Sequence, residues 1–451
     1  MKNIIKIFTL LLMMSAFANS CLAIQVGKID KLINNSKLNE TSTVAISVKN
    51  VSTGSTVYEK NAQKLVHPAS TLKIPATYFA INTVGYDYFF RTKFYTDKNN
   101  LYIKLGADPS LSVSDLKNAF RALKEQNLNS FDNLYIDDSI IDKKEFSQGW
   151  MWDDDVNPYT PKVSAYNLDN NVIKVNVTIA SDGTIKTSTS SKYPMSVFSY
   201  IQKSVKSEYY DIARYNWNNP ELVEIYGNTS NPQPIYVPIS SMRRYFIYNV
   251  DKILDDEKIT VKSTSYASKL VPNTAKEIYE ITNPIEPLIR DILQKSNNLI
   301  AETIFKIAGG NVYQSTGNDE AARAAMEGFY KDIDFKSVII KDGCGVSRNN
   351  LVSADWMTDI LRKIYKDKNF DKFKDYMAQP GDGTLSERLY DLRGEAWLKT
   401  GSLANISGIS GFVNSKDGNT YAVAIYTQNF IDNPKNVKKF EDEIITLIFN
   451  R

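Results

Sequence analysis

Ser70 and Lys73 are the first residues whose types and spacing could support catalysis. They lie three positions apart in the stretch 67–75, a spacing that puts both side chains on one face of a helix. A hydroxyl beside an amine is a nucleophile beside a base, provided that burial or a second cation lowers the pKa of the amine. Pro75 fits only the first turn of a helix, so Ser70 is predicted at the helix N-terminus, where free N–H groups favour developing negative charge.

The spacing alone is not specific, because Ser114 and Lys117 repeat it. That second pair lies in an amphipathic stretch with apolar Leu116, Phe120 and Leu123, so its lysine is expected to face water in an ordinary helix. His67 is the only histidine of the 451 residues, which excludes a zinc site built on several imidazoles. A serine hydrolase with this sequence is therefore expected to use a lysine as its base.

Two further stretches complete the candidate site. The polar residues Ser296, Asn297 and Asn298 interrupt two apolar helical stretches, 285–294 and 299–308, where an inward-turned polar loop is costly unless it serves a function. Lys399, Thr400 and Gly401 end a predicted strand, where the lysine can hold a carboxylate and the glycine permits close approach of a ligand.

The ordered set Ser-x-x-Lys, Ser-x-Asn, Lys-Thr-Gly resembles the signature of the penicillin-recognising serine hydrolases. The 226 residues between Ser70 and Ser296 resemble the class C low-molecular-mass penicillin-binding proteins, the D-alanyl-D-alanine carboxypeptidase/endopeptidase family S13. Cys344 stands where that family usually has serine. Further similar stretches are Gly106–Pro109, Gly149–Trp150, Asn298–Glu302, Asp342–Arg348, Asp382–Leu385 and Lys399–Leu403.

This resemblance implies a β-lactamase/transpeptidase-like fold, a mixed α/β antiparallel sheet covered by helices with a large α/β insertion. It implies that Ser70 attacks a D-Ala-D-Ala peptide of peptidoglycan with Lys73 as base, and that β-lactams acylate Ser70. Ser296 would relay a proton, and Asn298 would orient the substrate amide. The residues expected to bind the substrate carboxylate, or to hold the oxyanion by a backbone N–H, are Lys399, Thr400, Gly401 and Ser402. The reaction needs no metal or cofactor.

Hydrophobic patterning predicts how the chain divides. Residues 24–85 and 275–451 are expected to form a split catalytic domain, because a helix, hairpins and a C-terminal helix suggest one sheet covered by helices. Residues 86–274 form the insertion, with a hairpin over 91–105 and a strictly alternating strand over 173–179. A strand is also predicted over 337–340.

The N-terminus has the pattern of an export signal. Lys2 and Lys6 precede an apolar run and the small residues Ala18, Ser20 and Ala23, so residues 1–23 are predicted to be a cleaved leader, with cleavage after Ser20 as an alternative. Lipidation at Cys21 is a further alternative. If the leader is cleaved, the protein is predicted to be periplasmic, and peripheral membrane association is left open. No membrane-spanning helix is expected in the mature chain. Its one remaining cysteine, Cys344, is expected to be a free structural thiol.

The net charge of the chain limits the kinds of partner that it can bind. A formal charge of +3 gives no basis for nucleic acid binding, so the predicted partners are peptidoglycan peptides and β-lactams. A β-lactamase and a non-catalytic wall-binding protein stay as alternatives, and a homodimer is left open. Three satellite features have ordinary structural interpretations: a turn at Asp342-Gly343, core or interface positions for Trp150 and Trp152, and a solvated loop at residues 153–155.

Overall fold

The structure is a computed structural model that describes residues 27–204, 208–214, 218–263 and 266–451. The predicted leader, residues 1–23, lies outside the described residues. Within these ranges, no helix combines the length and apolar character needed to cross a membrane.

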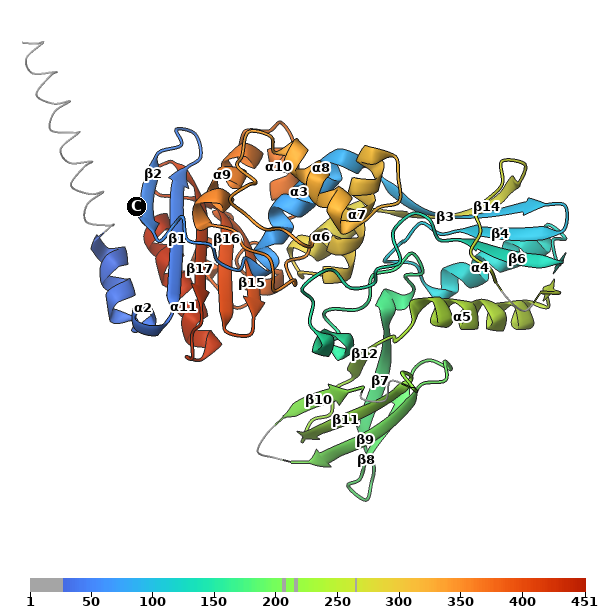
Figure 1. Ribbon diagram of the computed structural model, residues 1–451. Coiled ribbons are helices and arrows are strands. Elements are labelled where there is room, and N and C mark those ends of the chain that lie inside the picture. Colours follow the sequence, from blue (N-terminus) through green and yellow to red (C-terminus); the bar gives the residue numbers. More distant parts are fainter. Residues whose placement is uncertain (1–26, 205–207, 215–217, 264–265) are drawn as a thin grey trace, which may run out of the picture.

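A five-stranded antiparallel sheet organises one end of the molecule (Figure 1). Two strands come from the start of the chain and three from its end, so the two predicted halves of the catalytic domain meet in one sheet. In sheet order the strands are β15 (Ala396–Leu403), β16 (Ile406–Asn414), β17 (Thr420–Gln428), β1 (Thr43–Asn50) and β2 (Thr56–Lys60).

Both faces of this sheet are buried. Val44 and Ile46 of β1 belong to a core with α11 (Pro434–Phe449) and the helical residues 27–35. Ala45 of β1 and Ala424 of β17 point the other way, into a larger core shared with the helices of the catalytic domain. The alternation along the strands therefore separates two helical layers, one on each face, as the sequence predicts.

The larger layer carries the helices that position the candidate site. These are α3 (Lys73–Val84), α6 (Glu286–Leu293), α7 (Asn298–Tyr313), α8 (Asp319–Phe329), α9 (Ala354–Tyr365) and α10 (Phe370–Lys374). The first nine residues of α3 are all buried, so this helix lies inside the domain and not on its surface.

Helix α7 is longer than the sequence predicts. It passes through Gly309 and Gly310 to Tyr313 instead of ending at Ala308. A Cβ atom on Gly309 would lie 2.4 Å from the backbone nitrogen of Ala322 in α8. The glycines therefore allow two helices to pack closely, and do not end the first one.

The insertion begins with three strands of a four-stranded sheet, which Figure 1 shows to the right of the five-stranded sheet; the fourth strand, residues 276–284, comes from the start of the second stretch predicted for the catalytic domain. Lys117 lies in the helix over 113–125, as expected, and Ser112 caps this helix, because its side chain accepts a hydrogen bond from the Asp115 N–H. In sheet order the strands are β14 (Lys276–Pro284), β3 (Phe89–Asp97), β4 (Asn100–Lys104) and β6 (Asn133–Asp137), and the helices are α4 (Val113–Glu125) and α5 (Met242–Glu257).

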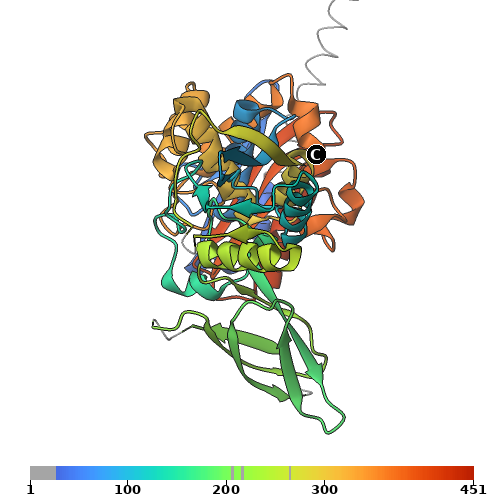
Figure 2. The ribbon, with the colours of Figure 1, turned by 90° about the vertical axis from the view of Figure 1, so that its right-hand side faces the viewer.

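A small β-sandwich projects from the rest of the molecule in both ribbon views (Figures 1 and 2). One sheet has the order β12-β7-β8, and the other has the order β10-β11-β9. Their bounds are β7 (Val172–Ile179), β8 (Ile185–Thr189), β9 (Ser196–Lys203), β10 (Tyr209–Ala213), β11 (Leu222–Thr229) and β12 (Ile235–Pro238). The shared core contains Val175, Val177, Ile201, Val223, Ile225, Ile235 and Val237.

The predicted strand at 337–340 is wrong. Only Ile339 pairs there, in an isolated bridge with Leu351. Extension stops because the next residues fold back as a turn around the side chain of Asp342, which accepts hydrogen bonds from the N–H groups of Gly345 and Ser347.

Candidate active site

Ser70 lies in a single 3₁₀ turn, Ala69–Leu72, that leads directly into α3. The neighbouring Thr71 hydroxyl fixes this turn, because it donates to the Pro68 carbonyl at 2.7 Å and lies 3.0 Å from the Tyr426 hydroxyl of β17. The expectation that Ser70 begins a helix is confirmed. The helix start and the sheet thus hold the serine in one place.

His67 supports the same turn from the other side. Its Nδ1 accepts a hydrogen bond from the Ala69 N–H at 3.0 Å, and its Nε2 lies 2.6 Å from the Ser347 carbonyl oxygen. This pairing fits a neutral ring with its proton on Nε2. Burial lowers the pKa of His67 and favours that neutral form. The only histidine of the chain therefore has its two nitrogens engaged in structure, away from the Ser70 hydroxyl.

Lys73 is fully buried and makes three hydrogen bonds. Its Nζ lies 2.9 Å from Ser70 Oγ, 2.5 Å from Asn298 Oδ1 and 2.5 Å from the Cys344 carbonyl oxygen. Burial lowers the pKa of Lys73, against the opposing influence of Cys344, Asp342 and Glu302. An amine that touches the hydroxyl and is biased toward its neutral form has the geometry of a general base.

Lys399 is the second fully buried lysine of the site. It donates to the Thr400 carbonyl at 2.8 Å. Burial, and then the charge of Lys73, hold the pKa of Lys399 well below its usual range. Two amines that repel each other in a buried site favour a single positive charge between them. A substrate carboxylate would supply the missing countercharge.

Gly401 brings β15 against the Ser70 turn. A Cβ atom at this position would lie 3.0 Å from the Ser70 backbone nitrogen and 2.9 Å from the Pro68 carbonyl oxygen. Only glycine fits without displacing the turn. The neighbouring Ser402 is exposed, and the Thr400 hydroxyl lies 2.8 Å from the hydroxyl of Thr384.

The Ser296 loop reaches the site through Asn298. The Asn298 side chain accepts from Lys73 and donates from Nδ2 to the Tyr159 carbonyl at 2.6 Å, so it joins the catalytic domain to the insertion. Asn297 caps α7 by accepting from the Ile300 N–H. Ser296 has a φ of 64°, a left-handed backbone that is uncommon outside glycine and often marks functional sites.

The structure therefore brings the three predicted stretches together. Ser70, Lys73 and Asn298 are linked directly by hydrogen bonds. The stretch from Lys399 to Ser402 packs against the Ser70 turn, and Ser296 lies two residues before Asn298. Among the described residues, neither Ser296 nor Ser402 hydrogen-bonds to Ser70.

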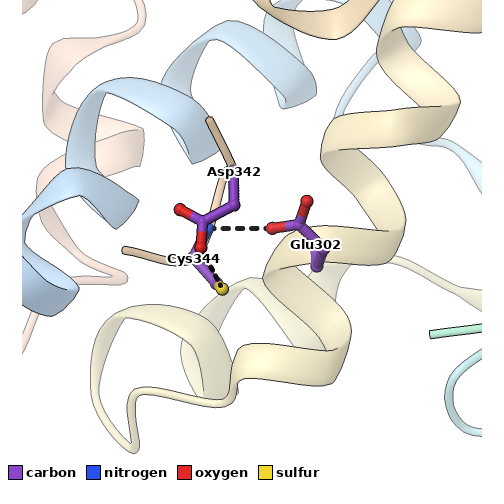
Figure 3. Close-up of side chains that lie close together, drawn as sticks. All are labelled: Glu302, Asp342 and Cys344. Carbon is purple, nitrogen blue, oxygen red and sulfur yellow. Dashed lines mark hydrogen bonds between the residues drawn. The ribbon is translucent and has the colours of Figure 1, made fainter. Parts of the chain in front are cut away.

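Sequence reasoning did not single out a buried cluster behind Lys73, formed by Glu302, Asp342 and Cys344 (Figure 3). Glu302 Oε2 accepts from the N–H groups of Gly343 and Cys344 at 2.8 and 3.1 Å. Asp342 accepts from the Gly345 N–H at 2.8 Å and from the Ser347 N–H at 2.6 Å. The two carboxyl groups thus hold the turn whose Cys344 carbonyl receives Lys73. Only the turn dipeptide Asp342-Gly343 signalled this in the sequence.

The two carboxyl groups and the thiol of this cluster lie close enough together to be ligands of one metal ion. The hydrogen bonds that they already make decide whether a cation fits there. Asp342 also accepts from Asn350 Nδ2 and from the Trp150 indole, and Glu302 Oε1 accepts from Ser147. All four carboxylate oxygens are thus engaged by protein donors. Burial raises the pKa values of Glu302 and Cys344 well above their usual ranges, which favours their neutral forms. These features describe a structural support for the turn.

Two satellite expectations need correction. Asp154 is buried and accepts from the Met151 N–H, and Asp155 forms ion pairs with Arg214 and Lys162 at 2.5 and 3.0 Å, so residues 153–155 are not a solvated loop. The three aspartates differ in their exposure to solvent because the side chains of adjacent residues point to different sides. Trp152 is 69% exposed, so of the two positions expected for it, core or interface, the core is excluded.

Comparison with known proteins was made on sequence and on structure. Residues 25–448 match the D-Ala-D-Ala carboxypeptidase 3 (S13) family. The chain is 22% identical over 416 residues to the D-alanyl-D-alanine carboxypeptidase DacB of Haemophilus influenzae, covering 87% of each chain. The crystal structure of penicillin binding protein 4 (dacB) from that organism superposes with a TM-score of 0.80 at 21% identity, covering 94% of this chain and 99% of that one. A second structure of that protein, in complex with a β-lactam, gives a TM-score of 0.76.

The family match spans nearly all of the described residues. The structural likeness extends over the insertion as well as the catalytic domain, because it covers 94% of the chain. The predicted fold class and enzyme class are both confirmed. The chain belongs to the D-Ala-D-Ala carboxypeptidase 3 (S13) family, and it is a serine-type D-alanyl-D-alanine carboxypeptidase.

Proposed function

We propose that Ser70 is the nucleophile of this carboxypeptidase and that Lys73 is its base. The observation that carries this assignment is the 2.9 Å contact between Lys73 Nζ and Ser70 Oγ, made by a lysine whose pKa burial lowers. As Ser70 Oγ forms a bond to the carbonyl carbon of the penultimate D-alanine, its proton passes to Lys73. The backbone N–H groups of Ser70 and Ser402 receive the oxyanion.

The leaving group departs on the Ser296 side. Ser296 relays the proton to the nitrogen of the breaking C–N bond, and Asn298 orients the substrate amide. The terminal carboxylate binds Lys399, with Thr400 and Ser402 beside it and Gly401 allowing the close approach. Water then attacks the ester on Ser70, the acid is released, and Ser70 regains its proton.

The same chemistry extends to peptide cross-links, whose bond also follows a D-alanine carbonyl. We therefore include endopeptidase activity in the proposal. β-Lactams acylate Ser70 because their ring carbonyl takes the place of the D-alanine carbonyl. Residues 1–23 act as an export signal, and the enzyme works in the periplasm. Residues 24–85 and 275–451 form the catalytic domain around the insertion 86–274.

Labelling with a fluorescent penicillin tests the assignment of Ser70. Wild-type protein is expected to carry covalent label, and a Ser70→Ala variant none. Unlabelled wild-type protein, or a labelled Ser70→Ala variant, would contradict the assignment. Release of D-alanine from a pentapeptide, measured beside β-lactam hydrolysis, then separates a carboxypeptidase from a β-lactamase. Cleavage of purified cross-linked dimers measures the endopeptidase activity.

A further inference from the structure

The sheet β10-β11-β9 of the sandwich has one face that no described element covers. Its other face packs on β12-β7-β8 through Ile201, Val223 and Ile225. The strand registers place four aromatic residues on the outer face, each exposed by between 36 and 53%: Phe198, Tyr200, Tyr209 and Tyr226. We call these four residues the aromatic face. Exposed aromatic clusters of this kind commonly mark binding sites.

Two rings of the aromatic face stack on each other. Tyr200 of β9 lies beside Tyr226 of β11 in the parallel register. Their ring centroids are 4.9 Å apart, and their planes differ by 13°. The stack holds both rings in place and leaves their outward faces available, so they need not be ordered at the moment of binding.

Hydrogen-bonding groups stand at the positions between the rings. Glu224 pairs with Phe198 in the register, and Asp211 pairs with Tyr226. Gln202 and Asn228 form the next pair along the same face. The Tyr226 hydroxyl donates to Glu224 Oε2 at 2.5 Å, which orients that carboxylate. The outer face thus alternates apolar planes with acceptors and amides.

We propose that the aromatic face binds the glycan strand of peptidoglycan. A pyranose ring has an apolar C–H surface that packs on an aromatic plane, and a rim of hydroxyl and amide groups that bond to carboxylates and side-chain amides. Tyr200 and Tyr226 supply the plane, while Glu224, Asp211 and Gln202 stand at its rim. This inference rests on the proposed function, which identifies the polymer on which the enzyme works.

Charge excludes an anionic partner. The outward positions of the three described strands carry Glu224 and Asp211, and none of them is lysine or arginine. A phosphate-rich polymer or an anionic membrane would be repelled by two carboxylates without a cation beside them. A glycan backbone presents hydroxyl and acetamido groups, which carry no charge and match acceptors.

Area and desolvation disfavour a second copy of the chain. Two strands of eight residues and one of five, about 4.8 Å apart, give a face of roughly 350 Å², less than half of what each partner of a stable complex buries. A dry interface would also bury Glu224 and Asp211 without a countercharge. A sugar chain is narrower than a protein, and it leaves these groups hydrogen-bonded.

Asp211, on the same side of the sheet as the aromatic face, lines a cavity of about 430 Å³ together with residues 152–153 and 155–158. Pro158 also lines a second cavity, of about 380 Å³, with Tyr159, Ser296 and Asn298. Tyr159 gives its carbonyl to Asn298 of the Ser296 loop. A glycan held on β9 and β11 would therefore lie near a wall that residues 152–159 share with the Ser296 loop.

Binding to a glycan without peptides tests this proposal directly. The probes are the hexamer of β-1,4-linked N-acetylglucosamine and peptidoglycan glycan strands stripped of their peptides, with penicillin-acylated protein so that the active site is closed. Wild-type protein is expected to bind both probes, and the double variant Tyr200→Ala/Tyr226→Ala to bind roughly tenfold or more weakly. Tyr390→Ala is the matched control, because that tyrosine is 60% exposed and lies away from the sandwich.

Activity separates this role from the catalytic one. For the double variant and for Tyr390→Ala, kcat/KM on a short soluble D-Ala-D-Ala peptide is expected to equal that of the wild type, while the double variant releases less product from intact sacculi. Unchanged glycan binding by the double variant, or equal loss in Tyr390→Ala, would overturn the proposal. So would a wild-type dimer that the double variant converts to a monomer. A protein that binds glycan but takes no penicillin label would instead contradict only the assignment of Ser70.

Discussion

The amine of Lys73 lies 2.5 Å from the backbone carbonyl oxygen of Cys344. This contact links the candidate base to a turn that is itself held by the buried carboxyl groups of Glu302 and Asp342. In the neutral amine, one hydrogen points to the Cys344 carbonyl and the other to Asn298 Oδ1, which leaves the lone pair directed at the Ser70 hydroxyl. The position of the base is therefore set by residues more than two hundred positions away in the chain.

Replacing Lys73 with methionine is expected to slow acylation by penicillin by about 10²–10⁴-fold, the usual contribution of a positioned general base. Methionine is chosen because the site is fully buried and the replacement keeps an unbranched side chain. Stopped-flow labelling measures the rate, and thermal unfolding checks that the variant is folded. A folded Lys73→Met protein that acylates at the wild-type rate would remove Lys73 from the mechanism.

The pH dependence of the same step follows from the lowered pKa of Lys73. Deprotonation creates the base, so the acylation rate should rise with pH and level off below the ordinary lysine value of 10.5. The rate is measured from pH 5 upward with a β-lactam whose own ionisation is constant over that range. A rate that still climbs steeply at the ordinary lysine value would show that burial does not tune this amine.

Cys344 is expected to contribute its backbone and not its thiol. Burial raises the pKa of the thiol well above its usual range, and the side chain is fully buried, so alkylation of native protein should leave Cys344 unmodified. Peptide mass spectrometry before and after unfolding measures this. A Cys344→Ser variant should acylate at a rate within a few-fold of the wild type, since the carbonyl that receives Lys73 is retained. A large loss would give the sulfur a role of its own.

The sequence predicts the candidate catalytic residues better than the surroundings that hold them. Ser70 and Lys73 are three residues apart, and helix geometry alone places them together. Glu302 supports Cys344 from forty-two positions away, and only the packing of α7 against the turn reveals that contact. The sandwich strand β9 was missed for a different reason. Its outer face carries the aromatic Phe198 and Tyr200 and its inner face the apolar Val197 and Ile201, so the strand lacks the polar–apolar alternation that normally identifies one.

Gly345 is expected to be essential for placing Ser70. Its φ is 83°, and a Cβ atom there would lie 2.0 Å from the Ala69 carbonyl oxygen. Gly345→Ala should therefore push the Ser70 turn out of register and reduce acylation by about a hundred-fold or more, as small displacements of catalytic groups do. Penicillin labelling measures the rate.

Gly394→Ala provides the matched control for this substitution. Gly394 has the same φ of 83°, but nothing lies within 4 Å of the added atom. Both variants carry the backbone strain of a left-handed alanine, about 1–2 kcal/mol, and only Gly345→Ala adds the collision. Similar acylation rates in the two variants would show that strain, and not contact with Ala69, limits the enzyme.

Glu441 of α11 makes the stability of the fold depend on pH. It is fully buried in α11 beside Arg388, at 3.2 Å, and burial raises its pKa to about 7. Because folding raises the pKa of this carboxyl, its neutral form contributes stability that is fully present below the pKa of the unfolded chain, about 4.5. That contribution is lost as pH rises from about 4.5 through 7. The loss is on the order of 3 kcal/mol for a shift of this size.

Glu441→Gln, which cannot ionise, should therefore gain stability relative to the wild type between pH 5 and pH 8. Urea unfolding across that range measures the difference, and a difference that stays constant with pH would mean that Glu441 is already ionised in the fold.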